Sequence, residues 1–266
     1  MIRLGVNSVL FGGSDFATAA RMVKVCGYDG IEVSAIAGMC EHLVLDRWQE
    51  QADAVRAAAA DNGLALLSME VASLDEARLE KAFAAAEAIG IPVVKVGPGG
   101  KSNEPGSLDQ SIAALTARAA SAARRGVTLC CKAHVGSAMF NTPTSLQVMA
   151  RISSPSFGID MDPSHIWRAG EEPAVALRAV LPRVKHVHIR DCKGRQTSPG
   201  APPLQACGRG DIDLAAYCAA MVEGRYDGPV CLEVIGAGAF PLAEATAIAA
   251  ESYGYLNACL KRLGAR

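Results

Sequence analysis

Short hydrophobic runs recur along the chain, and alanine-rich segments with apolar residues three or four positions apart separate them. Continuous apolar runs are typical of strands buried on both faces, whereas the wider spacing is typical of amphipathic helices. The segment after Val71 shows the helical pattern clearly, with Leu79, Phe83, Ala86 and Ile89 on one stripe. Eight runs have the strand pattern: 2–7, 30–35, 64–70, 92–97, 127–134, 157–162, 184–191 and 229–234.

Polar residues and glycines mark the expected helix ends. Ser73 followed three residues later by Glu76 predicts a capping box, and Gly90 predicts the end of that helix. Four other helical patterns are preceded in the same way, by Ser14, Asp46, Ser107 and Asp213. Each strand is therefore expected to lead into a helix that ends just before the next strand.

Eight strand–helix units in 266 residues average about 33 residues each, which is the size expected of a closed (β/α)8 TIM barrel with a parallel eight-stranded sheet. We predict one such domain over residues 1–266. The main competitor is an open doubly wound sheet, but "NSVLFGGSDF" after the first strand lacks its usual glycine fingerprint. The longest irregular segment, 192–210, follows the seventh strand and is expected to cover a pocket.

Charge and composition exclude several classes of protein. The net charge is −1 and no basic block stands out, so we expect no nucleic-acid partner. No apolar run has membrane-spanning length, and we expect no membrane association. The nine cysteines are odd in number and form no CxxC pair, which argues against a disulfide framework. With no leader pattern at the start, a cytoplasmic location is expected.

Polar residues gather at the carboxyl ends of the predicted strands, where barrel active sites form. Because alternate residues of a strand share a face, Asp162, His188 and Glu233 can converge from three neighbouring strands. Two carboxylates and an imidazole suit a divalent metal. The full set of strand-end residues is Glu32, Glu70, Lys95, Lys132, His134, Asp160, Asp162, His165, His186, His188, Arg190, Asp191 and Glu233.

Several of these residues also have simpler explanations. Asp162 can cap the turn that follows it, and His186 can be a structural residue. Glu32 and Glu70 can orient other side chains or pair with a lysine. Lys95 can bind an anionic group of a substrate or neutralise Glu70.

The order and spacing of the motifs resemble those of the sugar isomerase/epimerase superfamily of xylose isomerase-like barrels. That superfamily includes ketose 3-epimerases, hydroxypyruvate isomerases, inosose dehydratases and 3-dehydroshikimate dehydratases. The resemblance spans nearly the whole chain and rests on "GYDGIEV", "AIGIPVVKVGPGG", "FGIDMDPSHIWRAGEEP", "VKHVHIRD", "GRGDIDL" and "GRYDGPVCLEV".

The resemblance implies a set of metal ligands and one departure from it. The family's metal is held by Glu, Asp, His and Glu on strands five to eight, and Asp162, His188 and Glu233 match the last three. Lys132 stands at the position of the missing glutamate.

The resemblance also implies residues that contact the substrate. His165 matches the substrate-binding histidine of the sixth-strand motif, and His134 matches the histidine of the fifth-strand motif. We add Lys95, Arg190 and Glu70 as further candidate substrate-binding residues.

Lys132 leaves two possibilities for the chemistry. In the family, a metal polarises a carbonyl while two glutamates move a proton beside it. We prefer the interpretation in which no metal is needed, because the Lys132 ammonium pairs with Asp162 and Glu233 and polarises the carbonyl, with Glu233 as base. In the alternative, Asp162, His188 and Glu233 still bind Mn, Mg or Co, and Lys132, with a lowered pKa, is the second acid or base.

The expected function is therefore isomerase or epimerase chemistry on a keto-sugar or related small hydroxy-carbonyl compound, by proton abstraction next to the carbonyl. A dehydratase or lyase acting on a keto-sugar or keto-acid is one alternative. A non-catalytic binding relative or partner subunit of an enzyme is another. We expect a small carbohydrate-like substrate, and the resemblance suggests a homo-oligomer. Abasic-site endonucleases share this barrel but need more histidine and acidic ligands than the chain offers.

Overall fold

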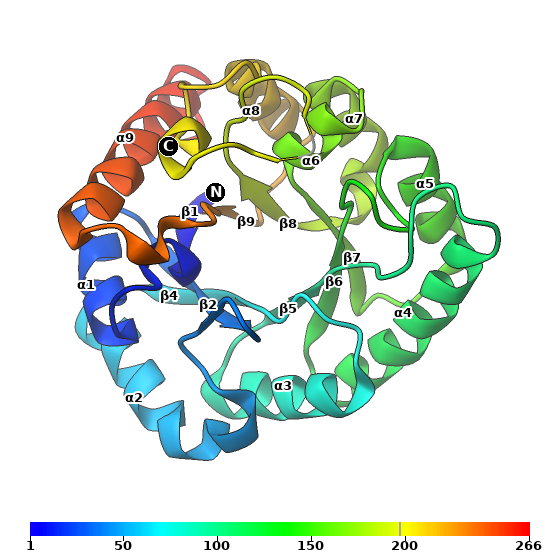
Figure 1. The fold of residues 1–266 in the computed structure, drawn as a ribbon, viewed down its shortest axis with the longest axis horizontal. Coiled ribbons are helices and arrows are strands. Elements are labelled where there is room, and N and C mark those ends of the chain that lie inside the picture. The colour runs from blue at the N-terminus through cyan, green and yellow to red at the C-terminus, as the bar shows by residue number, and fades with distance from the viewer. Residues whose placement is uncertain (197) are drawn as a thin grey trace.

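The computed structural model, which describes residues 1–196 and 198–266, confirms the predicted closed (β/α)8 barrel (Figure 1). Eight parallel strands close into a ring, since β1 pairs with β2 on one side and with β9 on the other. The ring consists of β1 (Arg3–Asn7), β2 (Gly30–Ile36), β4 (Ala65–Glu70), β5 (Val93–Val96), β6 (Thr128–Lys132), β7 (Phe157–Met161), β8 (Val184–Ile189) and β9 (Pro229–Leu232). All eight lie within the predicted runs or one residue beyond them.

Helices surround this ring on all sides in Figure 1. Each strand of the ring leads into at least one α-helix, as the alternating pattern predicts. The helices are α1 (Phe16–Val25), α2 (Trp48–Asp61), α3 (Glu76–Ile89), α4 (Ser107–Arg124), α5 (Thr142–Arg151), α6 (Pro163–Arg168), α7 (Pro173–Val180), α8 (Leu214–Glu223) and α9 (Leu242–Arg262). Short 3-10 helices lie at Ser8–Phe11, Leu45–Arg47, Leu181–Arg183, Pro202–Gln205 and Ala237–Ala239.

Four predicted helix starts are wrong by a residue or two. Arg47 precedes α2 where Asp46 was expected, and Gly106 precedes α4 where Ser107 was expected, in both cases without a side-chain cap. Asp75, not Ser73, caps α3 by accepting a hydrogen bond from the Arg78 amide at 2.8 Å. Asp15, not Ser14, caps α1 in the same way. In α1 and α3 the carboxylate of a nearby aspartate, not the serine hydroxyl, accepts from an amide of the first turn, where the helix dipole also favours a negative charge.

The predicted cap Asp213 and the predicted stop Gly90 are confirmed. The Asp213 carboxylate accepts from the Ala216 amide at 2.8 Å at the start of α8. Gly90 ends α3 with φ of 87°, a left-handed conformation that glycine adopts without a Cβ clash. The sequence pattern did not reveal β3 (Cys40–Glu41), a short antiparallel addition to β2.

Two glycines allow the first strands to pack closely. A Cβ on Gly30 would lie 2.5 Å from the carbonyl oxygen of Ala65, which belongs to the backbone of β4. A Cβ on Gly5 would lie 2.5 Å from Leu67 Cδ1. Glycine therefore fixes the approach of β1, β2 and β4 inside the barrel.

The hydrophobic core and the cysteines agree with the composition. Apolar residues of strands and inward helix faces, such as Leu79 and Phe83, are fully buried. All nine cysteines are free, as predicted. Within the residues that the structure describes, no helix combines the length and apolar character needed to cross a membrane.

Candidate active site

A pocket of about 450 Å³ opens at the carboxyl ends of the strands. Pro199 lines it, so the irregular 192–210 segment contributes to the pocket as expected. Lys95, Asp162 and His188 are fully buried beneath the pocket and do not line it. Six of the predicted site residues do line it: Glu70, Lys132, His134, His165, Arg190 and Glu233.

The strands bring these side chains together because parallel strands end at one rim of the barrel. Glu70 is the last residue of β4 and Lys132 the last of β6. Arg190 and Glu233 each come one residue after their strands, β8 and β9. Four long side chains from well-separated parts of the chain therefore meet at one rim of the barrel.

Lys132 lies between two carboxylates in the floor of the pocket. Its Nζ is 2.9 Å from both Oε1 and Oε2 of Glu233 and 3.1 Å from Oε1 of Glu70. The expected pairing with Glu233 is thus present, but the expected pairing with Asp162 is wrong, because Arg190 takes that position. The ammonium of Lys132 joins β6 to β4 and β9 across the barrel.

This pairing determines which groups are charged. Burial lowers the pKa of Lys132, but Glu233 and Glu70 outweigh burial and raise it to about 12. Burial raises the pKa of Glu233, yet His188, Lys132 and Arg190 hold it well below its ordinary value. Burial and the charge of Glu233 raise the pKa of Glu70 above its ordinary value. Glu233 is therefore the ionised member of the pair, and Glu70 is the member that holds a proton more readily.

Asp162, His188 and Glu233 form the predicted cluster, with one ligand atom of each lying within 4.8 Å of the others. Such acidic and histidine residues could hold a metal. However, Arg190 Nη2 lies 3.0 Å from Asp162 Oδ2 and 3.3 Å from Glu233 Oε2. The contact between Arg190 and Asp162 is an ion pair without good hydrogen-bond geometry, since Asp162 Oδ2 has no hydrogen-bond donor among the described residues.

The carboxylates around His188 also favour its protonated form, which cannot bind a metal. Burial lowers the pKa of His188, but Asp160 and Glu233 raise it to about 9. A histidine ligand must be neutral, and both oxygens of Glu233 already contact Lys132. The residues present therefore fit their own ammonium and guanidinium cations better than a metal, and we derive no chemical step through one. Asp162 additionally caps α6 through the Ser164 amide, so its simpler explanation also holds.

Lys95 lies in a second layer of charge, below the pocket. Its Nζ is 2.9 Å from Glu32 Oε1, 3.6 Å from Asp160 Oδ2 and 3.9 Å from Glu70 Oε2. The side chain is 0% exposed and does not line the pocket. Of the two roles left open for Lys95, the contacts favour neutralisation of carboxylates.

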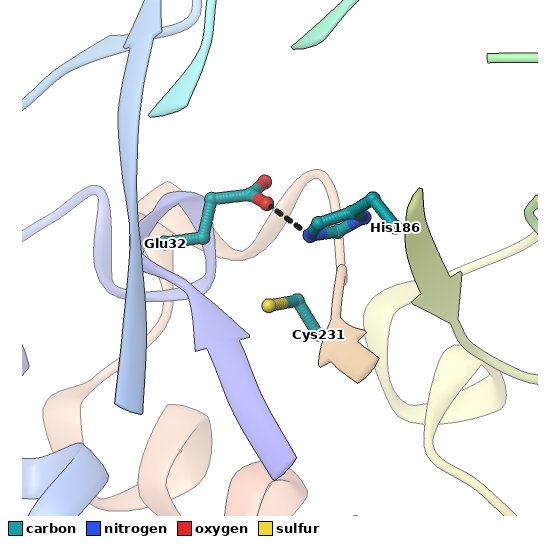
Figure 2. A group of neighbouring side chains, drawn as sticks. All are labelled: Glu32, His186 and Cys231. Atoms are coloured by element: carbon teal, nitrogen blue, oxygen red, sulfur yellow. Dashed lines mark ion pairs between the residues drawn. The ribbon is translucent and has the colours of Figure 1, made fainter. Parts of the chain in front are cut away.

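His186 belongs to the same layer. Figure 2 shows Glu32 of β2 and His186 of β8 pointing toward one another, with Cys231 of β9 beside them. His186 Nε2 lies 3.0 Å from Glu32 Oε2, and its Nδ1 lies 2.9 Å from Asp160 Oδ1. The three residues of Figure 2 are metal-ligand types, but the histidine is already held between two carboxylates. A structural role for His186 is thus supported.

His134 and His165 form a close, tilted pair at the wall of the pocket, with ring centroids 4.0 Å apart and an angle of 38° between the ring planes. Burial lowers the pKa of His134, and the charge of Lys132 lowers it further. Burial also lowers the pKa of His165, well below its ordinary value. Both rings are neutral at pH 7 and can exchange hydrogen bonds with hydroxyl groups.

Two residues of the site were missed from the sequence. Asn7 Nδ2 donates to Glu32 at 2.5 Å and to Glu70 at 2.6 Å, and so joins the two layers of charge. Arg168 lines the pocket beside His165. Their signals were available, since Asn7 ends the first strand and Arg168 follows His165 by three residues, on the same helix face.

The fold and the pocket define a (β/α)8 barrel whose charged site lies at the carboxyl ends of the strands. The chain belongs to the xylose isomerase-like TIM barrel family, whose model matches residues 20–259. A search of curated proteins finds no match.

Solved structures share this fold over nearly the whole chain. A D-psicose 3-epimerase determined in the presence of D-fructose has a TM-score of 0.78 and 16% identity, with 97% of this chain and 99% of that chain covered. A D-allulose 3-epimerase from Methylomonas sp. has a TM-score of 0.74 and 19% identity, with 97% and 98% covered. The probable 3-DHS dehydratase involved in petrobactin synthesis from Bacillus anthracis has a TM-score of 0.77 and 14% identity, with 96% and 98% covered.

Proposed function

We propose that the protein is an isomerase or epimerase of keto-sugars or related small hydroxy-carbonyl compounds, which moves a proton at the carbon next to a carbonyl. The observation that carries this proposal is the position of Lys132 Nζ between Glu70 and Glu233 in the pocket floor. Membership of the xylose isomerase-like family supports the chemistry, as do similar folds in proteins named as sugar epimerases.

Lys132 is the group proposed to polarise the carbonyl. Because Nζ contacts both oxygens of Glu233, a substrate oxygen can replace one of these contacts while the other remains. An ammonium with a pKa of about 12 stays protonated and stabilises the negative charge that develops on the oxygen of an enediolate. The same high pKa disfavours a Schiff base, which needs the neutral amine.

Glu233 and Glu70 are the proposed proton carriers. Glu233 is ionised and accepts the proton from the carbon, and its basicity rises when the substrate takes one of its Lys132 contacts. Glu70, whose pKa is raised, returns a proton to the enediolate from its own side. Two carboxyl groups whose surroundings move their pKa values apart are suited to separate base and acid roles. His134 and His165 are placed to orient the hydroxyl groups of the substrate.

Solvent-deuterium exchange tests the proposal directly. Purified protein in D₂O is incubated with a panel of ketoses and keto-acids, and loss of the carbon-bound proton signal is followed by NMR. We expect exchange that is abolished by Lys132→Met and by Glu233→Gln. The exposed Lys81, which pairs with Asp46 far from the pocket, gives the matched control Lys81→Met, and this variant should exchange as the wild type does.

Other outcomes of the same experiment identify the competing functions. Exchange that requires added Mn²⁺ and disappears with chelator would replace the ammonium mechanism by the metal alternative. Loss of water from the substrate, seen as a product 18 mass units lighter, would indicate a dehydratase. No exchange with any member of the panel would reject the proposed chemistry and favour a non-catalytic relative.

A further inference from the structure

Arg190 has a buried nitrogen that lacks a partner. The side chain is only 2% exposed and lines the pocket. Its Nη2 pairs with Asp162 and Glu233, and its Nε donates to Ser164 Oγ at 2.8 Å. Its Nη1 has no hydrogen-bond partner in the part of the chain that the structure describes. Buried guanidinium N–H groups at Arg78 and Arg118 also lack a partner among the described residues, but of the three arginines only Arg190 lines the pocket, where its N–H is available to an acceptor from outside the chain.

Arg168 brings a second guanidinium to the same wall of the pocket. Both arginines contact His165: Arg168 Nη2 lies 3.0 Å from its Nδ1 and 3.4 Å from its Nε2, and Arg190 Nη2 lies 2.9 Å from its Nε2. Burial lowers the pKa of Arg168, and the charge of Arg190 also lowers it, while Asp162 acts in the opposite direction. Two like charges therefore contact one imidazole ring.

The imidazole cannot accept hydrogen bonds from both arginines. The Val135 backbone N–H points at His165 Nδ1 from 3.3 Å, so Nδ1 carries the lone pair and Nε2 carries the proton. In this tautomer His165 Nε2 and Arg190 Nη2 are both hydrogen-bond donors, so their contact at 2.9 Å is not a hydrogen bond. The histidine thus contacts both arginines without satisfying Arg190, and an oxygen acceptor in the pocket would do so.

We infer that Arg168 and Arg190 form a clamp for the carboxylate of a small 2-keto or hydroxy acid, which places the substrate among keto-acids rather than neutral sugars. This inference rests on the proposed function, because the clamp lies in the same pocket as Lys132. Guanidinium groups bind carboxylates through paired, charge-assisted N–H···O bonds. Arg190 and Lys132 both contact Glu233 Oε2, so the carbonyl next to a carboxylate bound by Arg190 can reach Lys132.

The charges favour a carboxylate over a phosphate. The cations around the pocket are Lys132, Arg168 and Arg190. Glu70 holds its proton, and the ionised carboxylates are Glu233 and Asp162, which both contact Arg190. The net excess is one positive charge, which a single carboxylate neutralises. A phosphate, with nearly two negative charges, would also lie close to Glu233, and like charges in a buried site repel strongly.

Three small compounds test the class of substrate. Dihydroxyacetone, hydroxypyruvate and dihydroxyacetone phosphate share a HOCH₂–CO– unit and differ only in the third group, which is CH₂OH, a carboxylate or a phosphate ester. Deuterium exchange at the shared CH₂ group and binding by titration calorimetry are measured for each. We expect hydroxypyruvate to bind about 10- to 100-fold more tightly than dihydroxyacetone, the range expected for a charge-assisted pair.

Variants of Arg168 test the clamp, because this half-buried side chain can be replaced with less risk to folding than Arg190. Arg168→Met should raise the Kd and KM for hydroxypyruvate about 10-fold or more. Arg168→Lys, which keeps the charge but loses the planar fork, should have an intermediate effect. Arg195 provides the matched control, since it stacks on Trp167 and pairs with Glu172 away from the pocket lining. Arg195→Met should leave the preference for hydroxypyruvate unchanged.

The two readouts separate the clamp from the proposed function. Arg168-dependent binding of hydroxypyruvate without deuterium exchange would support the clamp and reject the chemistry. The clamp would be overturned, and the chemistry would stand, by two results together. Dihydroxyacetone and hydroxypyruvate would exchange equally well, and Arg168→Met would leave the Kd for hydroxypyruvate unchanged. A preference for dihydroxyacetone phosphate would overturn the assignment to keto-acids.

Discussion

Replacing Lys132 with methionine should greatly destabilise the protein, because the buried ammonium holds two carboxylates together. The contacts at 2.9 Å to Glu233 and 3.1 Å to Glu70 are lost together, while the apolar part of the side chain is largely kept. The rise in the pKa of Lys132 from 10.5 to about 12 alone corresponds to about 2 kcal/mol. Because the folded-state pKa is raised, this stabilisation is complete below pH 10.5 and is lost as the pH rises through about 12.

The full effect of Lys132→Met should exceed that figure, since Glu70 and Glu233 would then face each other without the cation between them. Removal of one partner of a buried ion pair costs about 3–5 kcal/mol. We expect about 3 kcal/mol, because Arg190 still lies 3.3 Å from Glu233 and Lys95 lies 3.9 Å from Glu70.

Urea denaturation at pH 7, followed by circular dichroism, measures this effect. The urea midpoints of the wild type and Lys132→Met are converted to free energies of unfolding with the same dependence on urea concentration for both proteins. Lys81→Met removes a lysine whose side chain is 49% exposed and ion-paired to Asp46, and it should shift the midpoint far less, because water screens exposed pairs. A loss of less than about 1 kcal/mol for Lys132→Met would refute the reasoning, since changes of that size are ordinary for any substitution.

Three further predictions concern the scaffold. Gly30→Ala should destabilise the barrel by about 1–3 kcal/mol or more, because the new Cβ meets a backbone oxygen. Gly254→Ala in α9, where nothing lies within 4 Å of the new Cβ, should instead stabilise the protein by about 0.5–1 kcal/mol. Thermal unfolding of the two variants and the wild type measures both effects. Burial lowers the pKa of His42 in the folded protein, so the unfolded chain binds a proton at this residue at higher pH than the folded chain does. The free energy of unfolding should therefore fall as the pH drops below 6.5. His42→Gln should reduce this dependence of the free energy of unfolding on pH. Asp213→Ala removes the cap of α8 and should lower the free energy of unfolding by about 1 kcal/mol, measured by denaturant titration, and an unchanged midpoint would contradict the capping role.

The architecture of the chain could be predicted from the sequence, but the partners of its charged groups could not. All eight strands of the ring were predicted, because strands buried on both faces need continuous apolar runs and glycines mark the turns between them. The sequence also predicted that Asp162, His188 and Glu233 lie close together, because the alternation of side chains along a strand fixes which residues share a face. Partner choice depends instead on how far long side chains reach across the barrel. Lys132 thus contacts Glu70 rather than Asp162.

Helix ends and short helices were harder to predict. The choice between adjacent polar residues as caps depends on the direction of one side chain, which spacing does not give. Arg168 was missed for a related reason, because only the turn of α6 brings it beside His165 and into the pocket. Neither signal is visible in the hydrophobic pattern.

The pairing of Lys132 with Glu70 has a consequence for the balance of charge between strands. Glu32 and Glu70 are inward carboxylates of β2 and β4, and Lys95 and Lys132 belong to β5 and β6, the next two strands of the ring. Lys95 lies 2.9 Å from Glu32 and Lys132 lies 3.1 Å from Glu70, so each acid has a cation from a later strand. A glutamate in place of Lys132 would leave three acids and one lysine on these four strands. Neutrality inside the first five strands of the ring therefore depends on Lys132.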